Sequence, residues 1–337
     1  MKIIHTADVH LDSPLAGVAD GKLRRRELLR ALSNVAEYAK NNGVQAVIVA
    51  GDLFDENSVS SETVKQTAQI ISSVAEWFIL RGNHGGKGYD VLKNCPNAHF
   101  FGEDWSYYTR GGVTIVGREL GVKDDVYWQK FSPPKDTYNV LVLHGDVADD
   151  SYGKIDKKVI AASKVDYVAL GHRHEFSAMN FGTVRACYCG VPEARGFDEG
   201  KSGFVVLDTD KNQIKFVESY LRRVEKIAVD VSAAQTPMQA ESMVMDAVSG
   251  VSPQNYLDLT LKGKVRCTVD ARMIRERLDG RFFALRISDK TAPDVDIARV
   301  AEEISLRGEF VRLAMQLPEE RRDEVLRLGF AALDGEL

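Results

Sequence analysis

One stretch of ten residues limits the fold of this chain more than any other: residues 46–55, AVIVAGDLFD. Its first half, Ala46–Ala50, is small or β-branched and apolar on both alternations, which predicts a strand buried on both faces. Gly51 permits a sharp backbone turn where that strand ends. Asp52 then stands at the carboxyl end of a buried strand, where open α/β sheets bind their ligands. The stretch therefore predicts an α/β fold with a polar site at its strand ends.

The residues before this stretch complete a strand–helix–strand unit. Lys2–Thr6 predicts a short strand, and residues 24–41 carry apolar side chains at helical spacing. A helix between two strands makes those strands parallel. The triplet Arg24-Arg25-Arg26 near the helix start is expected on a solvated helix face, with a phosphate-binding patch as the alternative.

Short apolar runs and turns continue to about residue 220. Strands or apolar runs are expected at 77–80, 98–105, 113–116, 139–143 and 166–170, helices at 60–76 and 154–162, and a hairpin at 204–207 with 213–218.

Residues with metal-binding or acid–base side chains follow five of these strands. They are Asp8, His10, Asp52, Asn83, His84, His144, His172 and His174. The chain has seven histidines, and five of them stand just beyond an apolar strand, which incidental surface histidines would not do. Strands of one sheet end along a common edge, so we expect these side chains to converge there.

Seven of these residues, all except His84, read as metal ligands. They offer nitrogen and oxygen but no thiolate, a mixture suited to manganese, iron or zinc. Seven ligands are too many for one tetrahedral zinc and fit two ions bridged by a carboxylate, an arrangement that cleaves phosphate esters. Asp52 is the expected bridge. His84 adjoins Asn83 and is better placed as a free imidazole that protonates the leaving group.

Composition sets the outer bounds. A chain of 337 residues predicts one large domain and a smaller one. It has no transmembrane span and no secretory leader pattern, so a cytoplasmic location is expected. The four cysteines read as reduced thiols. A net charge of −5 argues against a protein that coats nucleic acid, although bound metal can still hold a phosphate.

Five short motifs, DVH, GDLFD, GNH, HGD and GHRH, resemble in their order and spacing the calcineurin-like metallophosphoesterase superfamily. The segments HTADVHLDSPLAG and CYCGVPEARGFDEGKSGFVVLD are similar to SbcD-like DNA-repair exonucleases, in particular to a YhaO-like branch. This resemblance covers about residues 1–220. It implies a β-sandwich flanked by helices, two manganese ions and hydrolysis of DNA phosphodiesters.

The resemblance also implies roles for single residues. One metal would be held by Asp8, His10, Asp52 and His174, and the other by Asp52, Asn83, His144 and His172, with His84 as the proton donor. One departure is Gly85, where many relatives have an acidic residue that would orient the histidine. His84 would then be held less firmly.

Composition shifts near residue 222, and a second region follows. We predict a catalytic domain at 1–221, a small α+β capping domain at 222–292 and a helical partner-binding segment at 293–337. The middle region reads as strand–helix–strand–helix–strand, at 226–231, 240–248, 256–262, 270–278 and 282–287. It resembles the cap that such nucleases carry beside the active site.

The final region predicts three helices, at 295–305, 309–317 and 319–333, separated by Gly308 and Pro318. An apolar stripe that includes Leu306, Phe310 and Leu313 must be buried on something. Packing on the cap or in a homodimer is one interpretation. The family resemblance implies another, a dock for an SbcC-like coiled-coil ATPase.

The sequence therefore predicts a two-metal DNA nuclease that acts in DNA repair. Its expected partners are DNA and an ATPase, and no association with a membrane is expected. Two alternatives stay open. One is a phosphoesterase for a small phosphate ester, because the five motifs suit that reaction too. The other is a largely structural subunit that recruits an ATPase.

Overall fold

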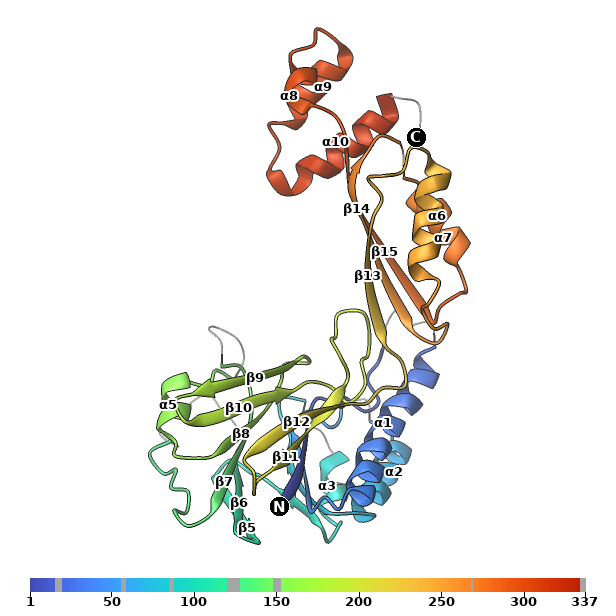
Figure 1. The fold of residues 1–337 in the computed structure, drawn as a ribbon. Coiled ribbons are helices and arrows are strands. Elements are labelled where there is room, and N and C mark those ends of the chain that lie inside the picture. The colour runs from blue at the N-terminus through green and yellow to red at the C-terminus, as the bar shows by residue number, and fades with distance from the viewer. Residues whose placement is uncertain are drawn as a thin grey trace. The chain divides into compact units, whose positions relative to one another are not determined.

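The computed structural model describes residues 1–15, 20–55, 59–84, 88–119, 128–147, 153–267 and 269–333. The chain divides into two compact units, Met1–Arg223 and Val224–Leu337 (Figure 1). All the site residues predicted from the sequence lie in the first unit. None of the described helices is long and apolar enough to cross a membrane.

The first sheet of this unit contains the strands at the start of the chain. Among the described residues its order is β12-β11-β1-β2-β3-β4. The strands are β1 (Lys2–Thr6), β2 (Ala46–Ala50), β3 (Glu76–Leu80), β4 (Ala98–Phe100), β11 (Gly203–Asp208) and β12 (Gln213–Glu218). Strands β1 to β4 are parallel, which confirms the predicted strand–helix–strand unit. The predicted hairpin β11–β12 is also present, with β11 antiparallel to β1.

The second sheet has the order β5-β6-β7-β8-β10-β9 within the described part of the chain. Its strands are β5 (Ser106–Arg110), β6 (Val113–Gly117), β7 (Tyr138–His144), β8 (Tyr167–Gly171), β9 (Phe176–Phe181) and β10 (Val184–Cys189). The β9–β10 hairpin was not among the predicted elements.

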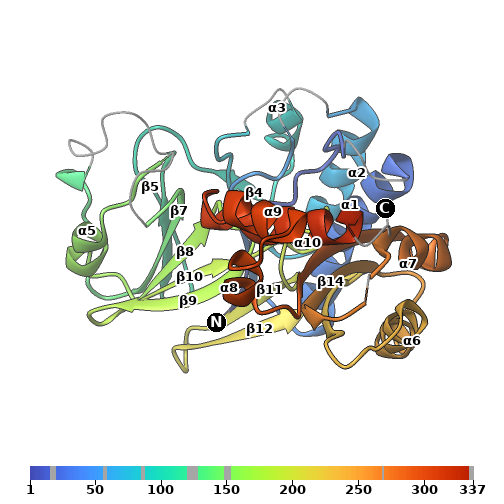
Figure 2. The same cartoon turned by 90° about the horizontal axis from the view of Figure 1, so that it is seen from above.

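The two sheets face each other across an apolar core, and helices cover their outer sides (Figures 1 and 2). Ile3 and Ile48 point into this core, whereas their neighbours Ile4 and Val47 pack outward beneath the helices. The helices are α1 (Gly21–Asn41), α2 (Ser61–Ser72) and α3 (Gly88–Leu92) on the first sheet and α5 (Lys157–Ala162) on the second. The β-sandwich fold is confirmed, but the expectation that all the site residues end one sheet is wrong.

A second correction concerns the arginine triplet. Arg24 is not on a solvated helix face, because its side chain is completely buried. Its guanidinium lies 2.9 Å from the buried carboxylate of Glu193 and also pairs with Glu27. Glu27 in turn accepts hydrogen bonds from Arg222, at 2.7 and 2.9 Å. This network ties α1 to the loop after β10 and to the end of the first unit.

The second unit begins with a parallel sheet, β13 (Val224–Asp230), β14 (Tyr256–Val265) and β15 (Ala284–Pro293). Helices α6 (Pro237–Val248) and α7 (Ala271–Leu278) lie side by side against it, so the predicted strand–helix alternation is present (Figure 1). Three further helices follow, α8 (Ile297–Ala301), α9 (Leu306–Ala314) and α10 (Glu319–Leu333).

Gly308 does not separate two helices as expected but lies inside α9. A side chain there would place its Cβ 2.2 Å from the carbonyl oxygen of Glu303, so the glycine permits a close approach to the turn after α8. The cap of α9 is Ser305, whose hydroxyl accepts a hydrogen bond from the Gly308 N–H at 3.0 Å.

Candidate metal centre

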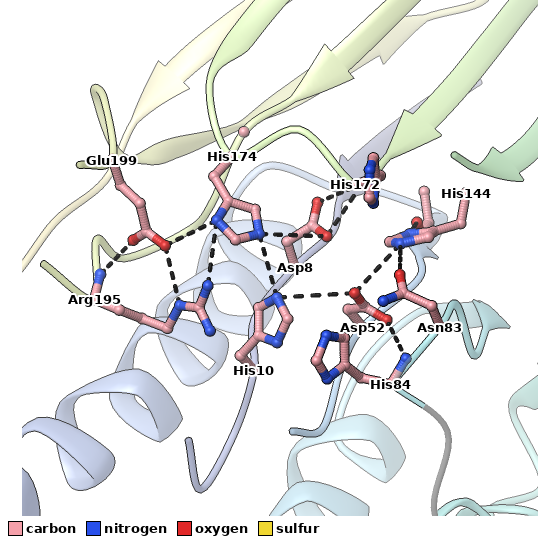
Figure 3. A network of polar contacts seen from close by, with 12 residues as sticks. Asp8, His10, Asp52, Asn83, His84, His144, His172, His174, Arg195 and Glu199 are labelled. Carbon is pink, nitrogen blue, oxygen red and sulfur yellow. Dashed lines mark hydrogen bonds and ion pairs between the residues drawn. The ribbon is translucent and has the colours of Figure 1, made fainter. Parts of the chain in front are cut away.

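The loops that follow β1 and β2 are joined by backbone hydrogen bonds. The Asp8 N–H donates to the carbonyl of Gly51, and the His10 N–H donates to that of Asp52, both at 3.0 Å. The Asp52 N–H donates to Arg81 after β3, at 2.8 Å. These bonds bring three strand ends of the first sheet together at one corner (Figure 3).

The ends of β7 and β8 in the second sheet meet the same corner, and glycines allow the approach. A Cβ at Gly51 would lie 2.0 Å from His144 Nδ1, and one at Gly171 would lie 1.9 Å from the Ala50 carbonyl oxygen. His144 can therefore reach across the sandwich and lie against β2. Four ligand candidates have left-handed backbone conformations, with φ of 53° at Asp8, 48° at His10, 53° at Asp52 and 102° at His172.

Two buried carboxylates form the centre of the cluster. Asp8 and Asp52 are only 1% and 2% exposed. Both oxygens of Asp8 accept from the His172 N–H, at 2.9 and 3.1 Å. Asp52 accepts from the His84 N–H at 2.9 Å and lies 3.3 Å from His144 Nε2. Burial raises the pKa of Asp8 to about 6. Burial also favours a higher pKa at Asp52, but the hydrogen bond and charge of His144 outweigh it and lower that pKa.

Three candidate ligands of one metal lie close together. His10 Nε2 is 3.3 Å from His174 Nε2, which is 4.0 Å from an oxygen of Asp8. These three side chains each place one ligand atom within reach of a single ion. Burial lowers the pKa of His10 to about 3, so its imidazole is neutral and keeps a lone pair for a metal.

A second group consists of Asp8, Asp52 and His144. Nδ1 of His144 lies 2.9 Å from the Ala50 carbonyl, to which it donates, so Nε2 faces Asn83 Oδ1 at 2.8 Å. Burial lowers the pKa of His144, but the hydrogen bond to Asp52 and the two carboxylates together raise it to about 9.

His172 is less well placed than its neighbours. Its ring lies 5.4 Å from that of His144, centroid to centroid. Its side chain belongs to none of the ligand groups found among the described residues. The predicted ligand role of His172 therefore stays a prediction.

His84 lies at the rim of the cluster, with its ring 4.9 Å from that of His10. Its Nδ1 is 3.5 Å from the carboxylate of Asp55, which the sequence reasoning did not single out. The signal was present in GDLFD, because Asp55 stands three residues after Asp52 on the same loop. Gly85, expected to weaken the hold on His84, lies outside the described residues.

Sequence reasoning also missed Glu199 and Arg195. Glu199 Oε1 lies 2.9 Å from His174 Nδ1 and 3.0 Å from Arg195 Nε. Burial raises the pKa of Glu199, but the hydrogen bond from His174 and the charge of Arg195 lower it to about 2. Both residues lie in the segment RGFDEGKSG, and nothing in its local pattern connects it to His174.

The donor set fits a metal centre. At His144, the backbone carbonyl fixes Nδ1 as the donor, so Nε2 points a lone pair at two further acceptor oxygens. A lone pair that faces the oxygens of Asp52 and Asn83 is unfavourable unless a positive charge lies between them. In the metal-free protein a proton on Nε2 supplies that charge, and a bound cation would supply it otherwise. Two nearly inaccessible carboxylates and facing imidazole nitrogens are ligands that divalent transition metals accept.

Comparison with known proteins gives consistent results. Residues 1–176 match the family model described as calcineurin-like phosphoesterase. The metallophosphoesterase YhaO of Bacillus subtilis is 23% identical over 89% of this chain and 84% of that protein. The DNA double-strand break repair protein Mre11 of Methanosarcina acetivorans is 26% identical over 97% of this chain.

The chain spans only 61% of that Mre11 protein. Among solved structures, an archaeal phosphodiesterase aligns with a TM-score of 0.41 and 17% identity, over 65% of this chain and 99% of that protein.

Proposed function

We propose a function from the premise that this chain belongs to the calcineurin-like phosphoesterase family, whose model matches residues 1–176. Membership makes it a metal-dependent phosphoester hydrolase with a dinuclear divalent metal centre. Our proposal is that it hydrolyses DNA phosphodiesters with two manganese ions. The observation that carries it is the corner where Asp8, Asp52 and His144 meet His10 and His174.

The metal assignment that we propose is the one implied by the family resemblance. Asp8, His10, Asp52 and His174 would hold one ion, and Asp52, Asn83, His144 and His172 the other. The position of Asp52 supports a bridging role, because its carboxylate oxygen lies 3.3 Å from His144 Nε2 and 3.9 Å from His10 Nε2. When bound, the ions would neutralise the phosphodiester and lower the pKa of the attacking water.

The chain's own residues supply the remaining chemistry. His84 lies beside the cluster with 32% of its side chain exposed, so it can meet a substrate. As an imidazolium it would donate a proton to the leaving oxygen. Asp55, 3.5 Å from His84 Nδ1, would hold that ring in orientation.

DNA is the proposed substrate because relatives named as DNA double-strand break repair proteins align over nearly the whole chain. The net charge of −5 predicts weak affinity for DNA by the chain alone. We therefore propose that residues 222–292 act as a cap that helps to select DNA. A homodimer or an ATPase partner would supply further contacts, and the cytoplasm is the proposed location.

The proposed ATPase contact involves the C-terminal helices. Ile304, Leu306 and Leu313 have exposed side chains around α9. An exposed apolar stripe on a helix is the kind of surface that another helix covers. We propose that an SbcC-like coiled coil binds there.

The deciding experiment is hydrolysis of end-labelled single- and double-stranded DNA with manganese, beside hydrolysis of bis-nitrophenyl phosphate. Native protein should give a ladder of short DNA products. Asp52→Ala should abolish both activities, because it removes the proposed bridging ligand. His84→Ser should greatly slow DNA cleavage while calorimetry still shows two bound manganese ions.

Other outcomes would separate the alternatives. Intact DNA with a cleaved nitrophenyl ester would favour a small phosphate ester as substrate, or dependence on an ATPase. Bound metal without either activity would favour a structural subunit. Failure to bind divalent metal at micromolar concentration would contradict the metal centre itself.

A further inference from the structure

We propose that Glu199 is a positioning residue for His174. Its carboxylate selects the imidazole tautomer that carries its proton on Nδ1, which leaves the Nε2 lone pair facing the metal centre. This inference rests on the proposed function, because it assumes that His174 is a ligand. It concerns a contact between segments 25 residues apart that no sequence motif announces.

The contact joins a buried carboxylate to a partly buried imidazole (Figure 3). Glu199 is 8% exposed, and its Oε1 lies 2.9 Å from His174 Nδ1. The other nitrogen of the ring, Nε2, faces His10 Nε2 at 3.3 Å and Asp8 at 4.0 Å. The imidazole therefore has one side toward the carboxylate and the other toward the candidate ligands.

The proton assignment follows from donor and acceptor chemistry. An ionised carboxylate only accepts hydrogen bonds, whereas a neutral imidazole has one donor and one acceptor nitrogen. The short contact with Glu199 is satisfied only if Nδ1 carries the proton. A carboxylate behind a ligating histidine fixes its tautomer and ring orientation in this way.

Arg195 is a competing hydrogen-bond donor to His174, which is why a carboxylate is needed beside this ring. Its Nη2 lies 3.3 Å from His174 Nδ1, so it could donate to an unprotonated Nδ1. That arrangement would move the proton to Nε2 and remove the metal-facing lone pair. Glu199 opposes it by accepting from Arg195 instead, through Nε at 3.0 Å and through the backbone N–H.

His144 provides an internal comparison. Its Nδ1 donates to the backbone carbonyl of Ala50, which serves the same purpose within the sandwich. His174 lies beyond the end of β8, in the turn before β9, and Glu199 comes from the separate loop between β10 and β11. The structure thus uses a backbone acceptor for one ligand and a side chain for the other.

The test is histidine nitrogen NMR of the metal-free protein, with His174→Asn to assign the signal. Native His174 should be the Nδ1–H tautomer. In Glu199→Gln, Arg195 or the new amide can donate to Nδ1, so the signal should shift toward the Nε2–H tautomer. Asp198→Asn is the matched control, because it removes the same charge from an exposed neighbour and should leave the tautomer native.

Manganese calorimetry gives a second readout. Glu199→Gln should weaken one manganese site by about 10- to 100-fold, the usual loss when the hydrogen-bond partner of a ligand is removed. Glu199→Asp keeps an acceptor-only side chain and should restore part of that affinity. Asp198→Asn should bind manganese as the native protein does.

Two results would overturn the inference. One is an Nε2–H tautomer at His174 in the native protein. The other is a folded Glu199→Gln variant with native tautomer and native manganese affinity. If the native protein instead binds no manganese while His174 keeps its Nδ1 proton, the proposed function fails but the positioning by Glu199 stands.

Discussion

At the residue scale, substitution of His84 tests the proposed proton transfer separately from metal binding. His84→Asn should lower the rate of DNA cleavage by about 10²- to 10⁴-fold, because an alkoxide leaving group needs a proton. The loss on bis-nitrophenyl phosphate should be much smaller, because nitrophenolate leaves without one. Steady-state kinetics on both substrates, with manganese calorimetry as the control, makes the comparison. Equal losses on both would mean that His84 binds phosphate rather than protonating the leaving group.

His5 lies in the core of the sandwich and gives a prediction about pH. Burial lowers its pKa to about 3, against 6.5 when exposed, so the folded state holds it neutral. Between pH 6.5 and pH 3 the unfolded chain binds a proton that the folded chain excludes. His5 should therefore lower the free energy of unfolding by up to about 1.4 kcal/mol for each pH unit below 6.5, and it should have no such effect above pH 6.5.

The measurement is urea unfolding of native protein and His5→Gln at pH 7 and pH 5. The variant loses the contact with the Tyr167 hydroxyl, 2.9 Å from His5 Nδ1, and should be less stable at pH 7. Its further loss on going to pH 5 should be smaller by roughly 2 kcal/mol. An identical pH dependence would show that His5 is not kept neutral in the fold.

Single residues also show what local sequence could and could not predict. Asp52 was identified because a buried strand leads straight into it, and strand ends are where ligands collect. Asp55 was missed although it stands on the same loop, because its role depends on the ring of His84 and not on its own spacing. Glu199 was missed because its partner comes from a distant segment, and only tertiary structure joins them.

At the scale of elements, the buried arginine of α1 carries a prediction about stability. Arg24→Met should destabilise the protein by about 3–5 kcal/mol, because it leaves the buried carboxylate of Glu193 without its charged partner. Arg25→Met, one position along the helix, should change stability by less than about 0.5 kcal/mol. Urea denaturation of the two variants provides the comparison.

A second change tests the cause. Adding Glu193→Gln to Arg24→Met should recover part of the loss, because no charge then remains buried. If the double variant lost as much stability as Arg24→Met and Glu193→Gln lose together when measured singly, the ion pair would not be the source of the destabilisation.

The elements themselves were largely predictable, but their assembly was not. Periodicity located β1, β2 and β3 because their apolar runs are short and bounded by turns. It could not show that β7 and β8 belong to a different sheet, because a strand buried on both faces has the same pattern in either sheet. The expectation of one common edge failed for that reason, although both sheets bring their strand ends to the same corner.

At the scale of the whole molecule, the division at Arg223 predicts a separable catalytic unit. All eight site residues and both sheets of the sandwich lie before it. A chain ending at Arg223 should fold, bind two manganese ions and hydrolyse bis-nitrophenyl phosphate at a rate near that of the full chain. It should lose DNA cleavage if the removed capping domain, predicted at residues 222–292, helps to select DNA.

Circular dichroism and manganese calorimetry would first establish that the shorter chain is folded. Both substrates would then be assayed at equal protein concentration. Retained DNA cleavage would contradict the cap. Loss of both activities in a folded, metal-loaded chain would mean that the second unit contributes to the site itself.

The left-handed backbone at four of the candidate ligands has a consequence for how such a chain changes over generations. Each strained non-glycine residue costs on the order of 1 kcal/mol, within a total stability of about 5–15 kcal/mol. Glycine at Asp8, His10, Asp52 or His172 would relieve part of that cost. Selection for stability alone would therefore favour replacing these four residues, so they should persist only where the proposed reaction is itself under selection.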